Sequence, residues 1–173
     1  MDMDYIHHYD SPLGGITMAS DGKALTGLWF DGQKHFAETI SAVHSTRQLP
    51  VFNETTRWLD LYFSGKDPGF TPALNMKTTV FRKAVWEMLL EIPYGRTQTY
   101  GKIAEKIAKQ VGRRHMSAQA IGGAVAHNAF LLIIPCHRVV GADGSLTGYA
   151  GGIQRKRKLL ELEGANISKL FIP

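Results

Sequence analysis

The N-terminal part of the chain alternates apolar and polar residues with the period of short β-strands. Runs of β-forming residues cover 4–8, 15–19 and 25–30, and the turn signals Ser11–Gly15 and Asp21–Gly22 separate them. In a strand, alternation places every second side chain on the same face of the sheet. The pattern therefore predicts a small antiparallel sheet at the N-terminus.

Beyond these strands, the spacing of apolar residues becomes that of helices. Residues 35–44 and 54–63 are both predicted to be helical. The following segment, Ser64–Pro72, is rich in Gly and Pro, which is typical of a boundary between domains. We therefore assign residues 1–76 to an N-terminal domain of sheet and helix, and residues 77–173 to a C-terminal domain.

The C-terminal part has the spacing of successive short helices. We expect them over 78–90, 99–108, 117–126 and 153–163. Ser117 is a candidate N-cap, and Gly164 is placed to end the last helix. The second and third helices, joined by a turn, have the form of a helix-turn-helix, although paired short helices are common in helical domains. The fold class predicted for the whole chain is α+β.

Membrane and secretory classes are excluded by the hydrophobic pattern. The longest apolar run, 129–134, is six residues, whereas a bilayer crossing needs about 20. Residues 1–10 are acidic and lack an apolar segment, so we expect no signal peptide. The single cysteine, Cys136, excludes an internal disulfide and a multi-cysteine zinc site. We therefore expect a cytoplasmic protein that does not bind membranes.

Charge is unevenly distributed along the chain. Residues 1–76 carry five Lys or Arg against nine Asp or Glu, a net charge of −4, and residues 77–173 carry fifteen against six, a net charge of +9. The total is +5. A basic C-terminal domain favours a polyanionic partner such as nucleic acid. Chance distribution of surface charge explains the same asymmetry about equally well at this point.

The residues around the cysteine favour a reactive thiol. A lone cysteine is most often a small buried hydrophobe, but Cys136 is followed by His137 and Arg138. A nearby cation lowers a thiol pKa and produces the nucleophilic thiolate. Neighbouring side chains on an extended segment point to opposite faces, so we expect a water to connect the thiol and His137. Glu161 and Glu163 are the downstream acids that could orient the histidine.

Three blocks in order carry a resemblance to a known family. They are Ile134–Val139 (IPCHRV), the preceding Gln119–Val125 (QAIGGAV) with Asn128, and the following Gly148–Gly152 (GYAGG). Together they resemble the O6-alkylguanine-DNA alkyltransferases, or methylated-DNA–protein-cysteine methyltransferases. The detailed match covers roughly residues 78–164. The N-terminal part resembles the family's ribonuclease-H-like sheet domain only in its general pattern.

The resemblance implies direct reversal of DNA damage. The damaged base, O6-alkylguanine or O4-methylthymine, is flipped out of double-stranded DNA into a pocket. Cys136 then takes the alkyl group irreversibly, so the protein acts once. No cofactor and no metal are expected, and a monomer is expected because a protein consumed by one lesion gains nothing obvious from symmetry.

The resemblance gives five residues a role at the reacting thiol: Cys136, His137, Glu163, Tyr100 and Asn128. Cys136 is the alkyl acceptor, His137 draws the thiol proton through water, and Glu163 orients the histidine. Asn128 holds the turn before the active-site segment. Tyr100 helps to rotate the nucleotide and can donate towards the base. Without the resemblance, Tyr100 would be interpreted as a tyrosine at the edge of the core.

The resemblance assigns contacts with DNA or the flipped base to eight residues: Ala118, Gln119, Gly122, Gly123, Arg138, Val139, Tyr149 and Ala150. Small side chains suit close approach of a helix to the minor groove. Gln119 stands where many relatives insert an arginine, so we expect flipping to persist with lower DNA affinity. Tyr149 is expected over the base, with backbone groups near Val139 and Ala150 at its edge. Arg138 is also expected to tie the active-site segment to neighbouring carbonyls.

Two other functions deserve comparison. A damage sensor that binds lesions without transfer would lack the acceptor thiol, and Cys136 argues against that class. A cysteine hydrolase needs a histidine in direct contact with sulfur and an oxyanion hole, and a sequential Cys-His pair is poorly arranged for that. His7 and His8 could suggest a metal, but relatives that bind zinc in this domain use cysteines that this chain lacks.

Overall fold

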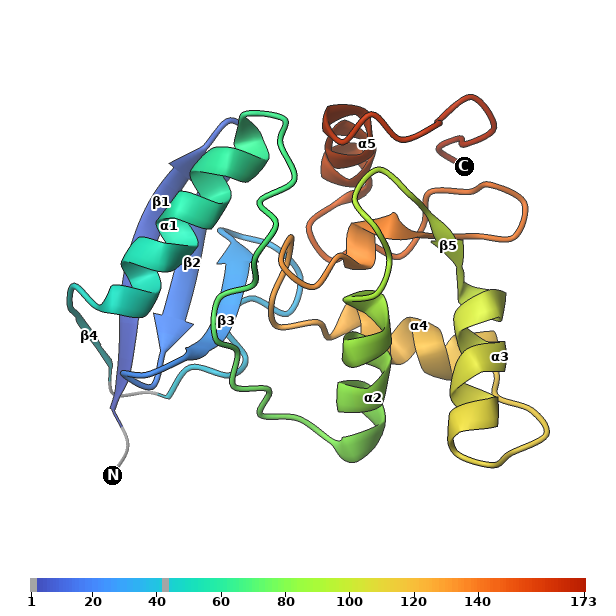
Figure 1. Ribbon diagram of the computed structural model, residues 1–173, viewed down its shortest axis with the longest axis horizontal. Helices are drawn as coiled ribbons and strands as arrows, with labels where there is room; N and C mark the ends of the chain where they lie inside the picture. The colour runs from blue at the N-terminus through green and yellow to red at the C-terminus, as the bar shows by residue number, and fades with distance from the viewer. Residues whose placement is uncertain (1–2, 42–43) are drawn as a thin grey trace. The chain divides into compact units, whose positions relative to one another are not determined.

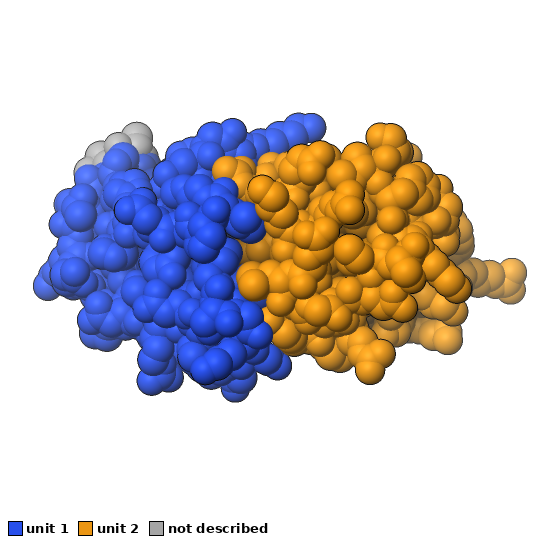
Figure 2. All heavy atoms as spheres, turned by 90° about the horizontal axis from the view of Figure 1, so that it is seen from above, with its two compact units in different colours: residues 1–77, 129–131 blue, residues 78–128, 132–173 orange. Residues whose placement is uncertain are grey.

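The computed structural model describes residues 3–41 and 44–173. The chain forms two compact units, which Figure 2 colours separately. Unit 1 comprises residues 1–77 and 129–131, and unit 2 comprises residues 78–128 and 132–173. The division predicted from the sequence placed all residues after 76 in the C-terminal domain. In the structure, residues 129–131 instead belong to unit 1.

Unit 1 is built on a four-stranded sheet (Figure 1). Its strands are β1 (Asp4–Ser11), β2 (Gly14–Ser20), β3 (Leu25–Phe30) and β4 (His44–Thr46). Their order is β3-β2-β1-β4, with antiparallel pairing except between β1 and β4. The predicted antiparallel sheet of three strands is confirmed, and the short parallel β4 is an addition to it.

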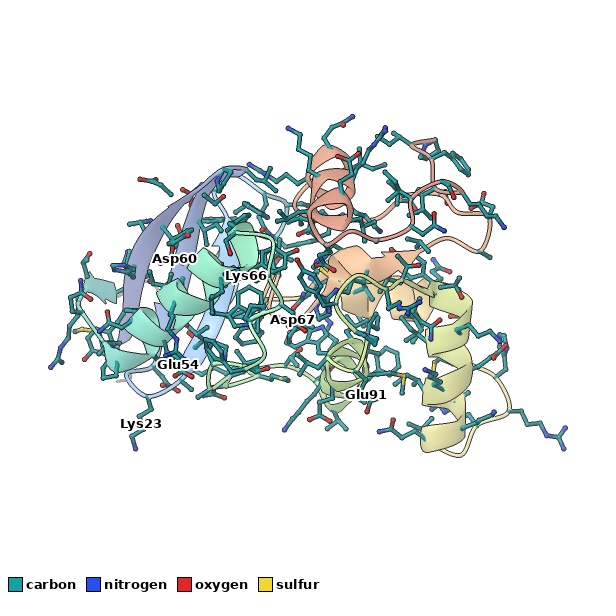
Figure 3. The ribbon with its side chains drawn as sticks, turned by 45° about the horizontal axis from the view of Figure 1, so that its top comes forward. Lys23, Glu54, Asp60, Lys66, Asp67 and Glu91 are labelled. Carbon is teal, nitrogen blue, oxygen red and sulfur yellow. The ribbon has the colours of Figure 1, made fainter. Side chains whose placement is uncertain are left out.

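Helix α1 (Pro50–Phe63) covers one face of this sheet (Figure 1). Its ring contact between Phe52 and His7 of β1 measures 5.5 Å between centroids. The helix begins before the predicted residue 54 because proline at the first helical position is pre-set for helical geometry. Glu54 and Asp60 lie on the helix and are exposed (Figure 3).

The helix predicted over 35–44 is wrong. The described part of this segment is a series of turns, and its end, His44, begins β4; residues 42 and 43 lie outside the described residues. His35 and Ala37 have φ values of 58° and 56°, a left-handed conformation that a right-handed helix does not admit. Side-chain bonds to the backbone replace the helical ones, such as that from Thr39 Oγ1 to the Thr26 carbonyl, 2.9 Å.

Residues 129–131 complete unit 1 from far along the sequence. The Leu28 N–H of β3 donates to the Ala129 carbonyl at 2.7 Å, and the Leu131 N–H donates to the Leu28 carbonyl at 3.0 Å. Phe130 between them is fully buried. The apolar run 129–134 forms only this bridge and no longer strand, because Leu132 turns the chain with a φ of 72°.

Unit 2 contains four α-helices among its described residues: α2 (Val80–Leu89), α3 (Tyr100–Gln110), α4 (Ala118–Ala126) and α5 (Ile153–Leu162). Thr79, Thr99 and Ser117 cap the first three through their side chains, which confirms the predicted starts. Helix α4 packs against both α2 and α3.

Two short parallel strands bring distant parts of unit 2 together. They are β5 (Gln98–Thr99), directly before α3, and β6 (Val139–Val140), directly after the cysteine segment. Within residues 3–41 and 44–173, no helix has the length and apolar character that a membrane crossing requires.

Candidate active site

The cysteine lies on a single turn of 3₁₀-helix, η1 (Cys136–Arg138). The sequence analysis treated this segment as extended, and the structure corrects that. All three side chains of the turn are buried, with Cys136 2% exposed and His137 fully enclosed. Because β6 follows the turn and pairs with β5, Tyr100 at the start of α3 is brought into the same region as the thiol.

The thiol is held in its protonated form at neutral pH. Burial raises the pKa of Cys136 to about 11, although a hydrogen bond with the Asn128 side chain and the charge of Lys156 act to lower it. Asn128 also donates from Nδ2 to the Ile134 carbonyl at 2.8 Å. This asparagine therefore ties the end of α4 to the residues just before the cysteine.

A carboxylate organises the other side of the turn. Glu163, at the C-cap of α5, accepts from His137 Nε2 at 2.5 Å and from Arg138 Nε and Nη2 at 2.8 and 3.2 Å. The Gly95 N–H donates to the same carboxylate at 3.0 Å. Arg138 also donates to the Ile92 carbonyl at 2.7 Å. Arg138 is thus buried within unit 2, where it ties the active-site segment to a neighbouring carbonyl and to Glu163.

The charges of this cluster fix the histidine tautomer. Burial acts to raise the pKa of Glu163, but the hydrogen bonds and charges of His137 and Arg138 outweigh it and hold that pKa well below its ordinary value. Burial lowers the pKa of His137, against the opposing effect of Glu163. An ionised carboxylate can only accept, so Nε2 of the neutral imidazole carries the hydrogen and Nδ1 is its basic nitrogen.

Lys156 is a functional candidate that the sequence analysis missed. It belongs to the basic run 155–158, yet its side chain is fully buried. Its Nζ donates to the Thr147 carbonyl at 2.8 Å and lies 5.9 Å from the centre of the Tyr100 ring. Burial lowers the pKa of Lys156 to about 8, and the nearby Cys136 opposes that shift. Its helical spacing from Ile153 and Leu160 was a usable signal.

Two tyrosines lie beside the thiol. The Tyr100 hydroxyl also donates to the Thr147 carbonyl, at 3.1 Å, and burial with the nearby Cys136 raises its pKa to about 12. Tyr149 is 9% exposed, and its ring meets that of His137 edge-on at 6.4 Å. Its hydroxyl is buried and finds no hydrogen-bond partner in the part of the chain that the structure describes. Val139 is buried and Ala150 is half-buried.

A separate surface is formed by the outer face of α4. Ala118, Gln119 and Gly123 are exposed and Gly122 is half-buried, so the four predicted contact residues share this face. A Cβ added at Gly122 or Gly123 would meet nothing within 4 Å. Glycine inside a helix costs about 0.5–1 kcal/mol relative to alanine. The two glycines therefore leave room that packing within unit 2 does not use.

Family comparisons match both units of the chain. The model described as 6-O-methylguanine DNA methyltransferase, DNA binding domain, matches residues 80–165, and that described as its ribonuclease-like domain matches residues 5–76. Among curated relatives, the methylated-DNA–protein-cysteine methyltransferase of Mycobacterium tuberculosis is 43% identical over 159 residues, covering 90% of this chain and 92% of the relative. The protein of the same name from Methanosarcina acetivorans is 41% identical over 162 residues, covering 93% of this chain and 99% of the relative.

Solved structures agree with these matches in fold. The crystal structure of M. tuberculosis O6-methylguanine methyltransferase has a TM-score of 0.79 and 41% identity, covering 94% of this chain and 93% of that one. The crystal structure of M. tuberculosis OGT in complex with DNA has a TM-score of 0.77 and 40% identity, covering 98% of this chain and 99% of that one. The expected α+β fold and family are thereby confirmed. The chain belongs to the methylated-DNA–protein-cysteine methyltransferase family, whose enzymes repair DNA by alkyl transfer.

Proposed function

We propose that Cys136 is the acceptor, and that it takes one alkyl group from O6-alkylguanine in double-stranded DNA and keeps it. The observation that carries this proposal is the buried thiol on the η1 turn, whose next residue, His137, is oriented by Glu163 at 2.5 Å. A thioether is a poor leaving group for water, so the alkylated protein has no route back to the thiol. The reaction is accordingly stoichiometric.

The proton of the thiol must leave before the sulfur can attack. With its pKa near 11, Cys136 is a poor nucleophile until a base accepts that proton. His137 is that base: Glu163 holds the hydrogen on Nε2, which leaves Nδ1 basic. We expect the proton to pass from the thiol to Nδ1 through a bridging water. The adjacent Glu163 then stabilises the imidazolium that forms, as in triad chemistry.

The two tyrosines serve the leaving base. As the S–C bond forms and the C–O6 bond breaks, the electron pair of the broken bond passes to the purine, which needs a proton donor. The Tyr100 hydroxyl, beside the thiol and raised in pKa to about 12, stays protonated and can donate. The Tyr149 hydroxyl is buried without a partner among the described residues and is available to the flipped base.

Helices α3 and α4 supply the DNA-binding element. We propose that they act as a helix-turn-helix, with α4 in the minor groove and Gln119 filling the space of the flipped nucleotide. The exposed small residues of α4 support this, because they let its backbone approach the groove closely. We further propose that the protein acts as a monomer and in the cytoplasm, where the single thiol stays reduced.

Intact-protein mass spectrometry tests the proposal. The protein is mixed with excess duplex containing O6-methylguanine, and Cys136→Ala serves as the control. We expect one added methyl group, on the peptide containing Cys136, and none on the variant. A second duplex with O4-methylthymine tests whether that lesion is also a substrate. Binding of the lesion without any change in mass would make the protein a damage sensor and would overturn the proposal.

A further inference from the structure

The helix proposed to enter the groove carries no charge. The sequence of α4, AQAIGGAVA, has no Lys, Arg, Asp or Glu. Attraction to the phosphate backbone supplies most of the sequence-independent affinity of DNA-binding proteins. That attraction must therefore come from cations outside α4.

A cluster of exposed cations lies directly before α4. We call the basic turn the group of Lys109 at the end of α3 and Arg113, Arg114 and His115 in the connection to α4; all four are exposed. Among the described residues, none of their side chains makes a hydrogen bond or an ion pair. They converge instead on one hollow of about 360 Å³, which also reaches Ala118, the first residue of α4.

The composition of this hollow favours a polyanion. Among the described residues that line it, the single acid is Glu105, whose carboxylate lies 3.6 Å from the Lys102 ammonium and so already has a cationic neighbour. Exposed, unpaired guanidinium groups are suited to phosphate oxygens, which they can bind in a bidentate manner. The hollow is open to solvent and reaches Ala118, on the exposed face of α4. A DNA strand that follows α4 would therefore pass over this hollow.

We propose that the basic turn binds backbone phosphates of the duplex beside the lesion and supplies the electrostatic attraction that α4 lacks. The proposal rests on the proposed function, in that it takes α4 as the helix at the groove. In this proposal the basic turn supplies affinity that does not depend on the base sequence, and the pocket around Cys136 recognises the damaged base.

The salt dependence of DNA binding tests this assignment. Arg113→Ala/Arg114→Ala is compared with Lys158→Ala/Lys169→Ala, which removes two exposed cations from the same unit with the same change in net charge. Dissociation constants are measured across salt concentrations for a duplex with O6-methylguanine and for the same duplex without damage. Each lost phosphate contact lowers the slope of log K against log salt by about 0.9.

We expect the slope of the arginine variant to fall by about 1.8 on both duplexes, which corresponds to roughly 30-fold weaker binding at about 0.15 M salt. The lysine control should keep the wild-type slope, and Arg113→Lys/Arg114→Lys should restore most of the lost affinity. If the arginine variant and the control show the same slope, the assignment is wrong. A loss confined to the damaged duplex would also overturn it, because phosphate contacts are common to both.

Failure of the basic-turn proposal can be distinguished from failure of the proposed alkyl transfer. Alkyl transfer from a free O6-alkylguanine base needs the pocket but no phosphates, so we expect its rate to be unchanged in the arginine variant. This measurement also shows that the variant is folded. Should wild type bind DNA with the expected slope yet never become alkylated, the transfer proposal fails and the basic turn stands. If instead transfer occurs and the slope does not respond, only the basic turn fails.

Discussion

At the scale of the residue, Glu163 stabilises the fold of unit 2 and has a proposed role in orienting His137. A carboxylate at a helix C-terminus is opposed by the helix dipole, and here it is also enclosed. Donors from His137, Arg138 and the Gly95 N–H outweigh both costs. Removing this charge would leave the buried Arg138 cation without its partner.

We expect Glu163→Gln to lower the free energy of unfolding by about 3–5 kcal/mol, as is typical when one member of a buried ion pair is removed. The rate of alkyl transfer should fall by about 100-fold, because the histidine loses the group that orients it. Urea unfolding and single-turnover transfer measure the two effects. A variant as stable as wild type would contradict the ion-pair interpretation.

The stabilisation by the Glu163–Arg138 ion pair should depend on pH. Because the pKa of Glu163 in the folded protein is below its ordinary value of about 4.3, the stability it contributes is present above that value and is lost as pH falls towards the folded pKa. The difference in stability between wild type and Glu163→Gln should therefore shrink as the pH is lowered from 5 to 3. A constant difference would place the stabilisation elsewhere.

Lys156 offers a second test at the same scale. Its charge acts to lower the pKa of the Cys136 thiol, so Lys156→Met should raise that pKa by about one unit and slow transfer about tenfold at pH 7. Stability should stay equal or increase, because methionine has no charge to bury. Lys156 has a pKa of about 8, so the wild-type advantage should decline between pH 7 and 9. A pH-independent ratio of rates would exclude this role.

At the scale of the element, α4 is built for contact rather than for its own stability. Gly122 and Gly123 weaken a helix of nine residues, and no neighbour within the unit requires them. The proposed close approach of the helix to DNA would account for their presence.

Gly122→Ala/Gly123→Ala should therefore stabilise unit 2 by about 1–2 kcal/mol through helix propensity. Affinity for duplex DNA should fall about tenfold, because the added methyl groups hold the helix away from the groove. Thermal unfolding and DNA titration give the two values. Higher stability with unchanged affinity would show that the glycines do not face DNA.

At the scale of the whole molecule, the two units differ in charge and are linked by more than one chain crossing. Unit 1 exposes acidic side chains such as Glu54, Asp60 and Asp67 (Figure 3), whereas the cations of the basic turn belong to unit 2. Residues 129–131 leave unit 2 to pair with β3 and then return to it. The sheet of unit 1 is therefore complete only when the later part of the chain is present.

Phe130→Ala should accordingly destabilise unit 1, by about 3–5 kcal/mol, because a fully buried aromatic ring is replaced by a cavity. Hydrogen exchange of β3 amides, particularly that of Leu28, reports the loss directly. A matched change at the half-exposed Phe171 should have a much smaller effect. Protection of Leu28 that is unaffected by Phe130→Ala would show that 129–131 do not hold this edge.

The sequence alone determined the features that depend on neighbours along the chain. Ser117 was recognisable as a helix cap because a cap bonds the backbone two or three residues away. The alternating strands and the order of the motifs around Cys136 were equally local. These local features were enough to predict the fold class, the family and Cys136 as the candidate reactive thiol.

The tertiary structure alone decided the features that depend on distant partners. Whether Lys156 lies in solvent or beside the thiol depends on the residues that enclose it, among them Thr147, whose carbonyl accepts from Nζ. The turns over 35–41 and the departure of 129–131 to β3 likewise depend on contacts far along the sequence. Local patterns specify backbone conformation and capping, whereas burial and the pKa of a group are set by every element that packs against it.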